Sequence, residues 1–196
     1  MKHSGFFMTA ILLSIFWGTV SPALAEDGDC QIMTSTKQVD YGRFRTEEMT
    51  QGSTEYNGKT YSGYASMTRE LQVSVMCPDE RKIRLFVDGP ARSGKAYRFS
   101  DSGAMSVKMK DARVDGESVQ LASVSRGAVQ AQGGSAEITL LPDMAAAAVN
   151  GQEVAGRNWT ATMMITTYLS ADTFRVSNNI DLEETYTVSF DALAVN

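Results

Sequence analysis

The sequence predicts an all-β domain, an antiparallel β-sandwich of seven or eight short strands. Apolar and polar residues alternate over several short stretches, which is the period of a strand with one buried face. Turns rich in Gly, Pro, Asn and Asp separate those stretches, and no stretch shows a sustained helical period. A chain of 196 residues has the length of one domain with a sizeable core.

The first 25 residues are typical of an export signal. Lys2 supplies a basic start, residues 6–20 are largely apolar, and the stretch that ends at Ala25 carries small residues where signal peptidase cuts. The apolar run is short for a membrane span, and no later run replaces it. We therefore expect cleavage after Ala25, which leaves residues 26–196 as a single exported domain that does not span the membrane.

Cleavage also limits the chemistry of the chain. It removes the only histidine and one of the 18 basic residues, so 17 basic residues face 23 acidic ones, a net charge of −6. The basic group Arg81, Lys82 and Arg84 is expected on the solvated face of a strand. Nucleic-acid binding needs a larger basic cluster, and acid–base catalysis and metal binding commonly use histidine. We expect no enzyme activity, no cofactor, no metal and no nucleic-acid partner.

Cys30 and Cys77 are the only cysteines, and each lies beside a predicted strand. In an oxidising compartment two cysteines allow one intramolecular bridge. Such a bridge would stabilise the fold by about 4 kcal/mol in the chain-entropy model. The alternative is two unrelated buried thiols.

Taken in order, the predicted strands have apolar residues at alternate positions. They cover 38–44, 71–76, 83–87, 105–109, 119–121, 138–141, 159–166 and 185–192, beside a hairpin within 51–66 that decorates the domain and a further short stretch at 173–176. Gly42 inside the first of them indicates a bulge, and Asn57-Gly58 is a strong hairpin turn. Residues 128–135 are expected to form a loop, and residues 145–148 a single helical turn.

Three tyrosines in the predicted hairpin, Tyr56, Tyr61 and Tyr64, lie among Gly, Ser and Asn residues. This mixture gives amphipathic contact area at a low entropic cost, as it does in antibody loops. The hairpin is therefore a candidate ligand-binding loop for a glycan or a host receptor. The alternative is that the tyrosines cover their own strands.

The order of these features resembles subunits of bacterial fimbriae that are assembled by the chaperone–usher route. The residues that carry the resemblance are Cys30, Val39-Asp40-Tyr41-Gly42, the stretches 71–77 and 82–87, Asp115-Gly116 and the alternating terminal strand. They indicate a poorly characterised fimbrial-like branch, and the resemblance covers most of the mature chain.

The resemblance implies an incomplete, pilin-like, immunoglobulin-like sandwich that lacks its last strand. A periplasmic chaperone would lend a strand to the resulting groove, and a neighbouring subunit would later replace it. The edge expected to receive that strand carries Tyr186, Val188, Phe190 and Ala192. The implied partners are the chaperone, an usher and other fimbrial subunits, and the implied location is the periplasm and then a fimbrium on the cell surface.

The chain departs from the family at both ends. It ends Ala194-Val195-Asn196, without the tyrosine that family members often carry just before the last residue. Cleavage would leave only residues 26–29 before Cys30, too few to donate a strand, so the chain is expected at the fimbrial tip. Alternatively, the chain is a free secreted module that binds carbohydrate or a host surface, or its own terminal residues complete the sandwich.

Overall fold

A computed structural model describes residues 29–56, 59–92, 96–101, 103–175 and 182–195, and the side chains of residues 52–62 lie outside this description. The predicted export signal also lies outside the described residues. Fourteen strands are described, and eight of them have six or more residues. They are β2 (Thr50–Tyr56), β3 (Lys59–Ala65), β4 (Arg69–Asp88), β7 (Gly103–Val114), β9 (Gln120–Ser125), β11 (Met144–Asn150), β13 (Ala155–Leu169) and β14 (Thr187–Ala194).

The remaining described elements are short. They are the strands β1 (Gln31–Thr34), β5 (Ala91–Arg92), β6 (Ala96–Phe99), β8 (Glu117–Ser118), β10 (Glu137–Leu140) and β12 (Gln152–Glu153), and the 3-10 helices η1 (Thr46–Glu48) and η2 (Ala171–Arg175). None of the described helices is long and apolar enough to cross a membrane.

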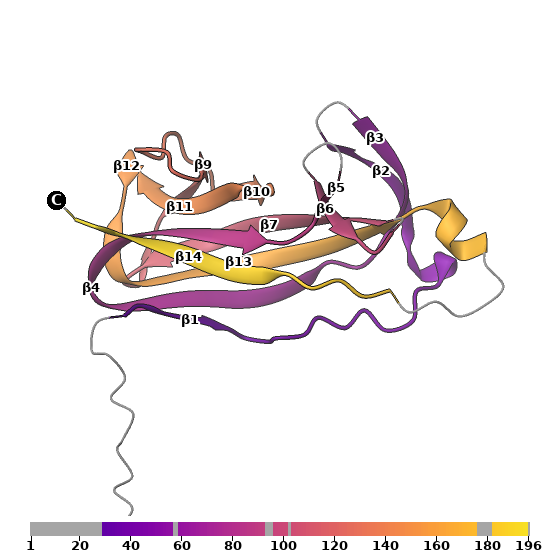
Figure 1. The fold of residues 1–196 in the computed structure, drawn as a ribbon, viewed down its shortest axis with the longest axis horizontal. Coiled ribbons are helices and arrows are strands. Elements are labelled where there is room, and N and C mark those ends of the chain that lie inside the picture. Colours follow the sequence, from indigo (N-terminus) through magenta and orange to yellow (C-terminus); the bar gives the residue numbers. More distant parts are fainter. Residues whose placement is uncertain (1–28, 57–58, 93–95, 102, 176–181, 196) are drawn as a thin grey trace, which may run out of the picture.

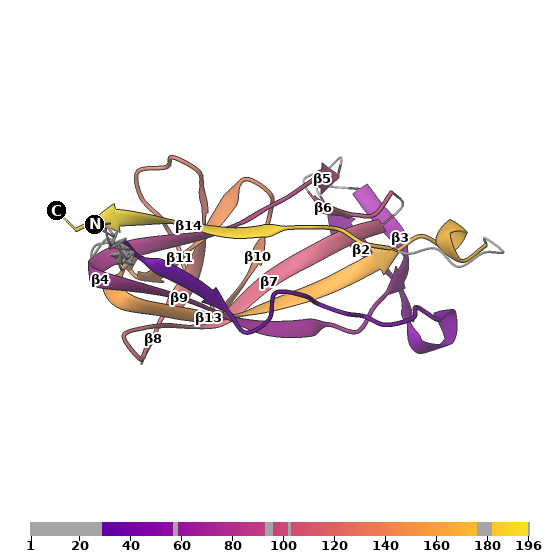
Figure 2. The same cartoon turned by 60° about the horizontal axis from the view of Figure 1, so that its bottom comes forward.

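The strands form an antiparallel β-sandwich, as the sequence predicts. The long strand β4 bends between Met76 and Arg81, where its register with β13 shifts, so that its two arms belong to different layers (Figure 1). The first arm lies between β1 and β13, and β13 also pairs with β7. The second arm lies between β14 and β11, and β11 also pairs with β9. Figure 2 shows β1 and β14 running along the same side of the molecule.

The main core lies between the two layers, and the two arms of β4 illustrate how it forms. Leu71, Val73 and Val75 of the first arm are buried, and the residues between them face outward. Ile83, Leu85 and Val87 of the second arm are also buried in the same cluster. Trp159 on β13 completes the centre of the core with 2% of its surface exposed. The predicted alternation is therefore confirmed for the strands that bury one face.

The alanine run at residues 145–148 is a strand and not a helical turn. It belongs to β11, which is paired on both sides, with β9 and with the second arm of β4. Ala146 and Ala148 lie in the main core, and Ala145 and Ala147 lie in a second cluster on the outer face of the layer. Burial on both faces removes the period of two, and sheet pairing outweighs the helical preference of alanine.

The second cluster explains why Arg84 does not face solvent as the sequence suggested. The loop 126–136 crosses the outer face of the layer, and its Arg126 guanidinium lies 3.9 Å from the centre of the Phe86 ring. Arg84 is 3% exposed beneath this loop. Its guanidinium donates to both carboxylate oxygens of Glu153, at 2.8 and 2.9 Å, and to the carbonyl oxygens of Ala128 and Val129.

Candidate functional site: a groove beside the last strand

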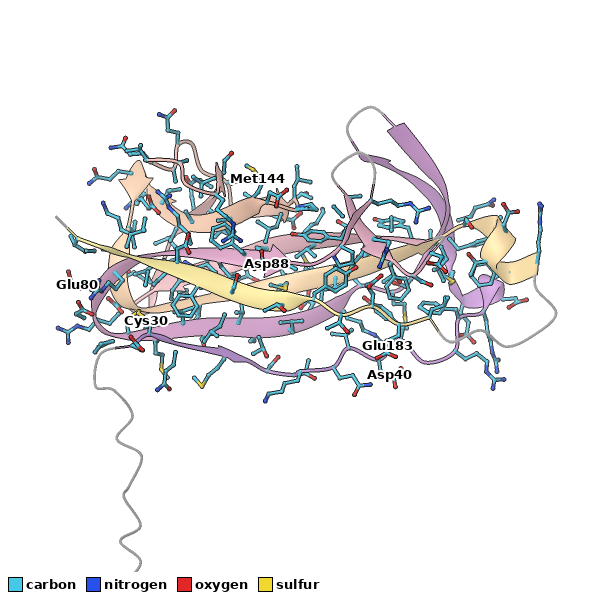
Figure 3. All side chains as sticks on the ribbon, in the orientation of Figure 1. Cys30, Asp40, Glu80, Asp88, Met144 and Glu183 are labelled. Atoms are coloured by element: carbon cyan, nitrogen blue, oxygen red, sulfur yellow. A yellow bond between two sulfur atoms is a disulfide. The ribbon has the colours of Figure 1, made fainter. Side chains whose placement is uncertain are left out.

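The disulfide between Cys30 and Cys77 is present, as the sequence predicts. It ties the residue before β1 to the end of the first arm of β4, next to the bend. Figure 3 shows Cys30 at this end of the sandwich, close to Glu80. The bridge holds β1 at the border of its layer, where β1 pairs with residues Val73 to Met76 of β4.

The last strand, β14, leaves one of its edges free. It pairs with the second arm of β4 from Thr187 opposite Asp88 to Ala194 opposite Arg81. No other strand within the described residues pairs with β14. Backbone N–H and C=O groups along the other edge are therefore available to a further strand.

A groove of about 1670 Å³, with an apolar floor and walls that carry polar and charged residues, opens between the segment before β14 and the segment that contains β1. Residues 182–188 form one wall, and residues between Ile32 and Phe44 form the other. Asp40 and Glu183, one from each wall, are labelled in Figure 3. The floor consists of apolar core side chains: Leu71, Val87, Phe99, Met105, Val107, Met163 and Ile165.

The wall after β1 is irregular, although the sequence predicted a strand at 38–44. Pairing with β4 ends at Thr34, followed by one hydrogen bond from the Ser35 N–H to the Gln72 carbonyl oxygen. The Gly42 N–H then donates to the Asp40 carboxylate, and Gly42 has a φ of +67°. A left-handed residue in a tight Asx turn interrupts an extended chain, so this stretch does not remain a strand.

Two aromatic side chains anchor this irregular wall. The Tyr41 hydroxyl donates to the Ile165 carbonyl oxygen at 3.1 Å, and the Phe44 ring contacts the Phe99 ring edge to face at 6.4 Å between centres. Burial raises the pKa of Tyr41 to about 12, against the opposing effects of a Ser66 hydrogen bond and the nearby Arg69 charge. Tyr41 therefore stays protonated and remains a hydrogen-bond donor at neutral pH.

All four edge residues predicted from the sequence pack against the main core, but they divide into two pairs. Tyr186 and Val188 line the groove. Phe190 and Ala192 lie further along β14, opposite Leu85 and Ile83, and are not among the residues that line it. The open space thus covers only the part of the predicted edge that comes first in the chain.

Tyr186 is held in place by residues that the sequence did not connect with it. Its ring meets the Tyr97 ring edge to face at 5.8 Å between centres. A Cβ atom at Gly89 would collide with the Tyr186 ring, so glycine at this position allows the close approach. Burial raises the pKa of both phenols, and both hydroxyls are buried without a hydrogen-bond partner within the described residues. Asp88-Gly89-Pro90 indicated a turn but gave no sign of this packing.

The candidate ligand-binding tyrosines lie in the hairpin formed by β2 and β3. The backbone register places Tyr56 opposite Lys59 and Tyr61 opposite Thr54, and the side chains of Tyr56 and Tyr61 lie outside the described residues. The Tyr64 ring packs edge to face on Phe174 of η2 at 5.2 Å between centres. A ligand-binding role of the three tyrosines stays a prediction.

The described residues hold no group of three or more His, Cys, Asp or Glu side chains that could bind a metal ion. The chain matches no family model, and it matches no curated protein. Among solved structures, it is similar to the P pilus rod subunit PapA, with 9% sequence identity and a TM-score of 0.43. The similarity covers 83% of this chain and 98% of that structure.

Proposed function

We propose that this chain is an exported fimbrial-type subunit, structural or adhesive, that accepts a β-strand from a periplasmic chaperone or from a neighbouring subunit. One observation carries the proposal: a groove with an apolar floor opens beside residues 182–188, next to the start of β14, and no described strand pairs with the outer edge of β14. The edge can supply regular main-chain hydrogen bonds to an added strand, and the groove can receive its alternate side chains.

The physical chemistry of the groove supports a second chain as its occupant. Each apolar side chain that an added strand buries there would contribute about 1.5–3 kcal/mol. Without an occupant, a free edge beside apolar side chains is prone to aggregation. A chaperone that lends a strand until a subunit replaces it would bury these apolar side chains and would also cover the free edge.

The remaining parts of the proposal concern location and assembly. A disulfide between Cys30 and Cys77 suits the oxidising periplasm, from which the subunit would pass through an usher to a fimbrium on the cell surface. A position at the fimbrial tip depends on the expected cleavage after Ala25. Mass determination of the mature N-terminus tests that cleavage.

Co-expression in the bacterial periplasm with the chaperone encoded beside this chain tests the proposal. We expect the wild-type chain to co-purify with the chaperone, and Val188→Asp to lose the complex, because a carboxylate would then face the apolar groove. Val129→Asp is the matched control, since it is the same substitution at a residue that is 91% exposed and does not line the groove. Circular dichroism and intact disulfide in both variants confirm that they fold.

Two results would contradict the proposal. One is a folded monomer that ignores the chaperone. The other is equal chaperone binding by Val188→Asp and Val129→Asp.

A further inference from the structure

We infer that residues 182–186 are a preformed extension of β14 that lacks only a pairing partner, and that the ion pair between Arg98 and Glu184 positions it. The strand that the groove accepts would pair with this extension as well as with β14. The inference rests on the proposed function, because the added strand is the one proposed above. It specifies which backbone receives that strand and which side chains hold the backbone ready.

The segment ahead of β14 has the side-chain pattern of a strand. Leu182, Glu184 and Tyr186 are partly buried, whereas the residues between them, Glu183 and Thr185, are exposed. The alternation continues into the start of β14, and in Figure 1 the segment continues the line of that strand. A period of two is typical of an extended chain with one face on a core. The segment is therefore already extended in the direction of β14.

This segment nevertheless has no backbone partner within the described residues. The pairing of β14 with β4 begins at Thr187 opposite Asp88, and no described backbone–backbone hydrogen bond involves residues 182–186. The reason is that β4 ends at Asp88 and that Pro90 follows two residues later. Proline has no N–H to donate, and the Pro90 carbonyl oxygen accepts a hydrogen bond from the Arg98 N–H. Within the described chain, both edges of the segment are thus open.

Two neighbouring residues of β6 hold the segment in place through its side chains. The Arg98 guanidinium donates to the Glu184 carboxylate at 3.1 Å, and the Glu184 side chain is 14% exposed. The Tyr97 ring packs edge to face on the Tyr186 ring. Glu184 and Tyr186 are two residues apart on the same face of the extended chain, so the two contacts fix its position and its direction. A segment that is already held in its paired conformation costs less to order when a partner arrives.

The facing wall of the groove also lacks backbone pairing. No described backbone–backbone hydrogen bond involves residues 36–44, and the Asp40 carboxylate accepts from the Gly42 N–H within the same wall. Residues 182–186 and residues 36–44 both line the groove. A strand between them would therefore gain hydrogen bonds to residues 182–186 without breaking an existing backbone pair.

Amide hydrogen exchange measured by NMR tests the inference in the full oxidised chain. The probe is a strand of alternating Val and Thr, appended to the C-terminus through a short turn and long enough to run back to Leu182. Without the appended strand, the amides of residues 182–186 should all exchange fast. With it, alternate amides in this segment should slow by about tenfold or more, since every second N–H of a strand points toward the same neighbour.

Glu184→Gln and Arg98→Gln test whether the ion pair positions the segment. In the fused protein, each substitution should reduce the protection of residues 182–186 by about three- to fivefold, as expected for the loss of one charge pair. The two substitutions together should cost no more than either alone, because they remove the same interaction. Glu137→Gln is the matched control, since it is the same substitution in an ion pair, with Lys108, that does not line the groove. It should leave the protection unchanged.

Three results would count against this account, each at a different point. Equal protection in Glu184→Gln and Glu137→Gln would overturn the positioning role of the ion pair. New protection confined to Thr187–Ala194 would overturn the extension of β14 and leave strand acceptance intact. No new protection at any amide beside the groove would contradict the proposed function itself.

Discussion

Removal of the Glu153 carboxylate should destabilise the protein far more than removal of a surface carboxylate. The side chains of Arg84 and Glu153 are 4% and 6% exposed, and Arg84 forms two charge-assisted hydrogen bonds with Glu153. Glu153→Ala leaves the buried guanidinium with only the carbonyl oxygens of Ala128 and Val129. Breaking a buried pair in this way costs about 3–5 kcal/mol.

An exposed ion pair on the same protein provides the control. Lys108 and Glu137 are also 2.8 Å apart, but their side chains are 48% and 44% exposed. Glu137→Ala should cost at most about 1 kcal/mol, since water replaces the lost partner.

Urea unfolding of the oxidised protein measures both variants. With a slope of about 1–3 kcal/mol/M, the midpoint of Glu153→Ala should fall by at least about 1 M, and that of Glu137→Ala by much less. Equal midpoints for the two variants would refute the conclusion that the buried Arg84 guanidinium depends on the Glu153 carboxylate.

Three further predictions concern stability. Replacing Cys30 and Cys77 by serine should cost about 4 kcal/mol, because the bridge closes a loop with a sequence separation of 47, and urea unfolding against the wild type measures this. Asp115→Ala should cost about 1–2 kcal/mol, because the Asp115 carboxylate accepts hydrogen bonds from the backbone N–H groups of Arg157 and Asn158. Asp115→Asn should lose less stability than Asp115→Ala, and thermal unfolding measures the difference. The pKa of Tyr41 is about 12 in the folded protein and about 10 in the unfolded chain. The contribution of its protonated hydroxyl to stability is therefore complete below pH 10 and should be lost as the pH rises to about 12. In unfolding measured as a function of pH, Tyr41→Phe should lose less stability over this range than the wild type.

The strands that bury one face could be predicted from the sequence, because such strands have a period of two. Leu71, Val73 and Val75 show this in β4, and Val107 and Met109 show it in β7, where Lys108 between them is exposed. The β11 strand could not be identified this way, because a run of alanines buried on both faces has no period. Nor could Arg84, whose burial depends on a loop more than 40 residues away in sequence.

The alternation from Tyr186 to Ala192 predicted a strand, and the resemblance to fimbrial subunits implied that its edge lies beside a groove. Which residues line the groove depends on tertiary structure. β1 leaves β4 after Thr34, and the turn at Gly42 directs the chain along the opening. Local propensity does not reveal either event.

Hydrogen exchange along β14 tests the central claim most directly, that this strand presents a free edge that another backbone can fill. In the isolated oxidised protein, amides between Thr187 and Ala194 should alternate between slow exchange, where they bond to β4, and fast exchange, where they face the free edge. When a strand is appended to the C-terminus through a short turn, so that it lies antiparallel to β14, the fast amides should become slow. Uniformly slow exchange in the isolated protein, or fast amides that the fused strand does not protect, would contradict the claim.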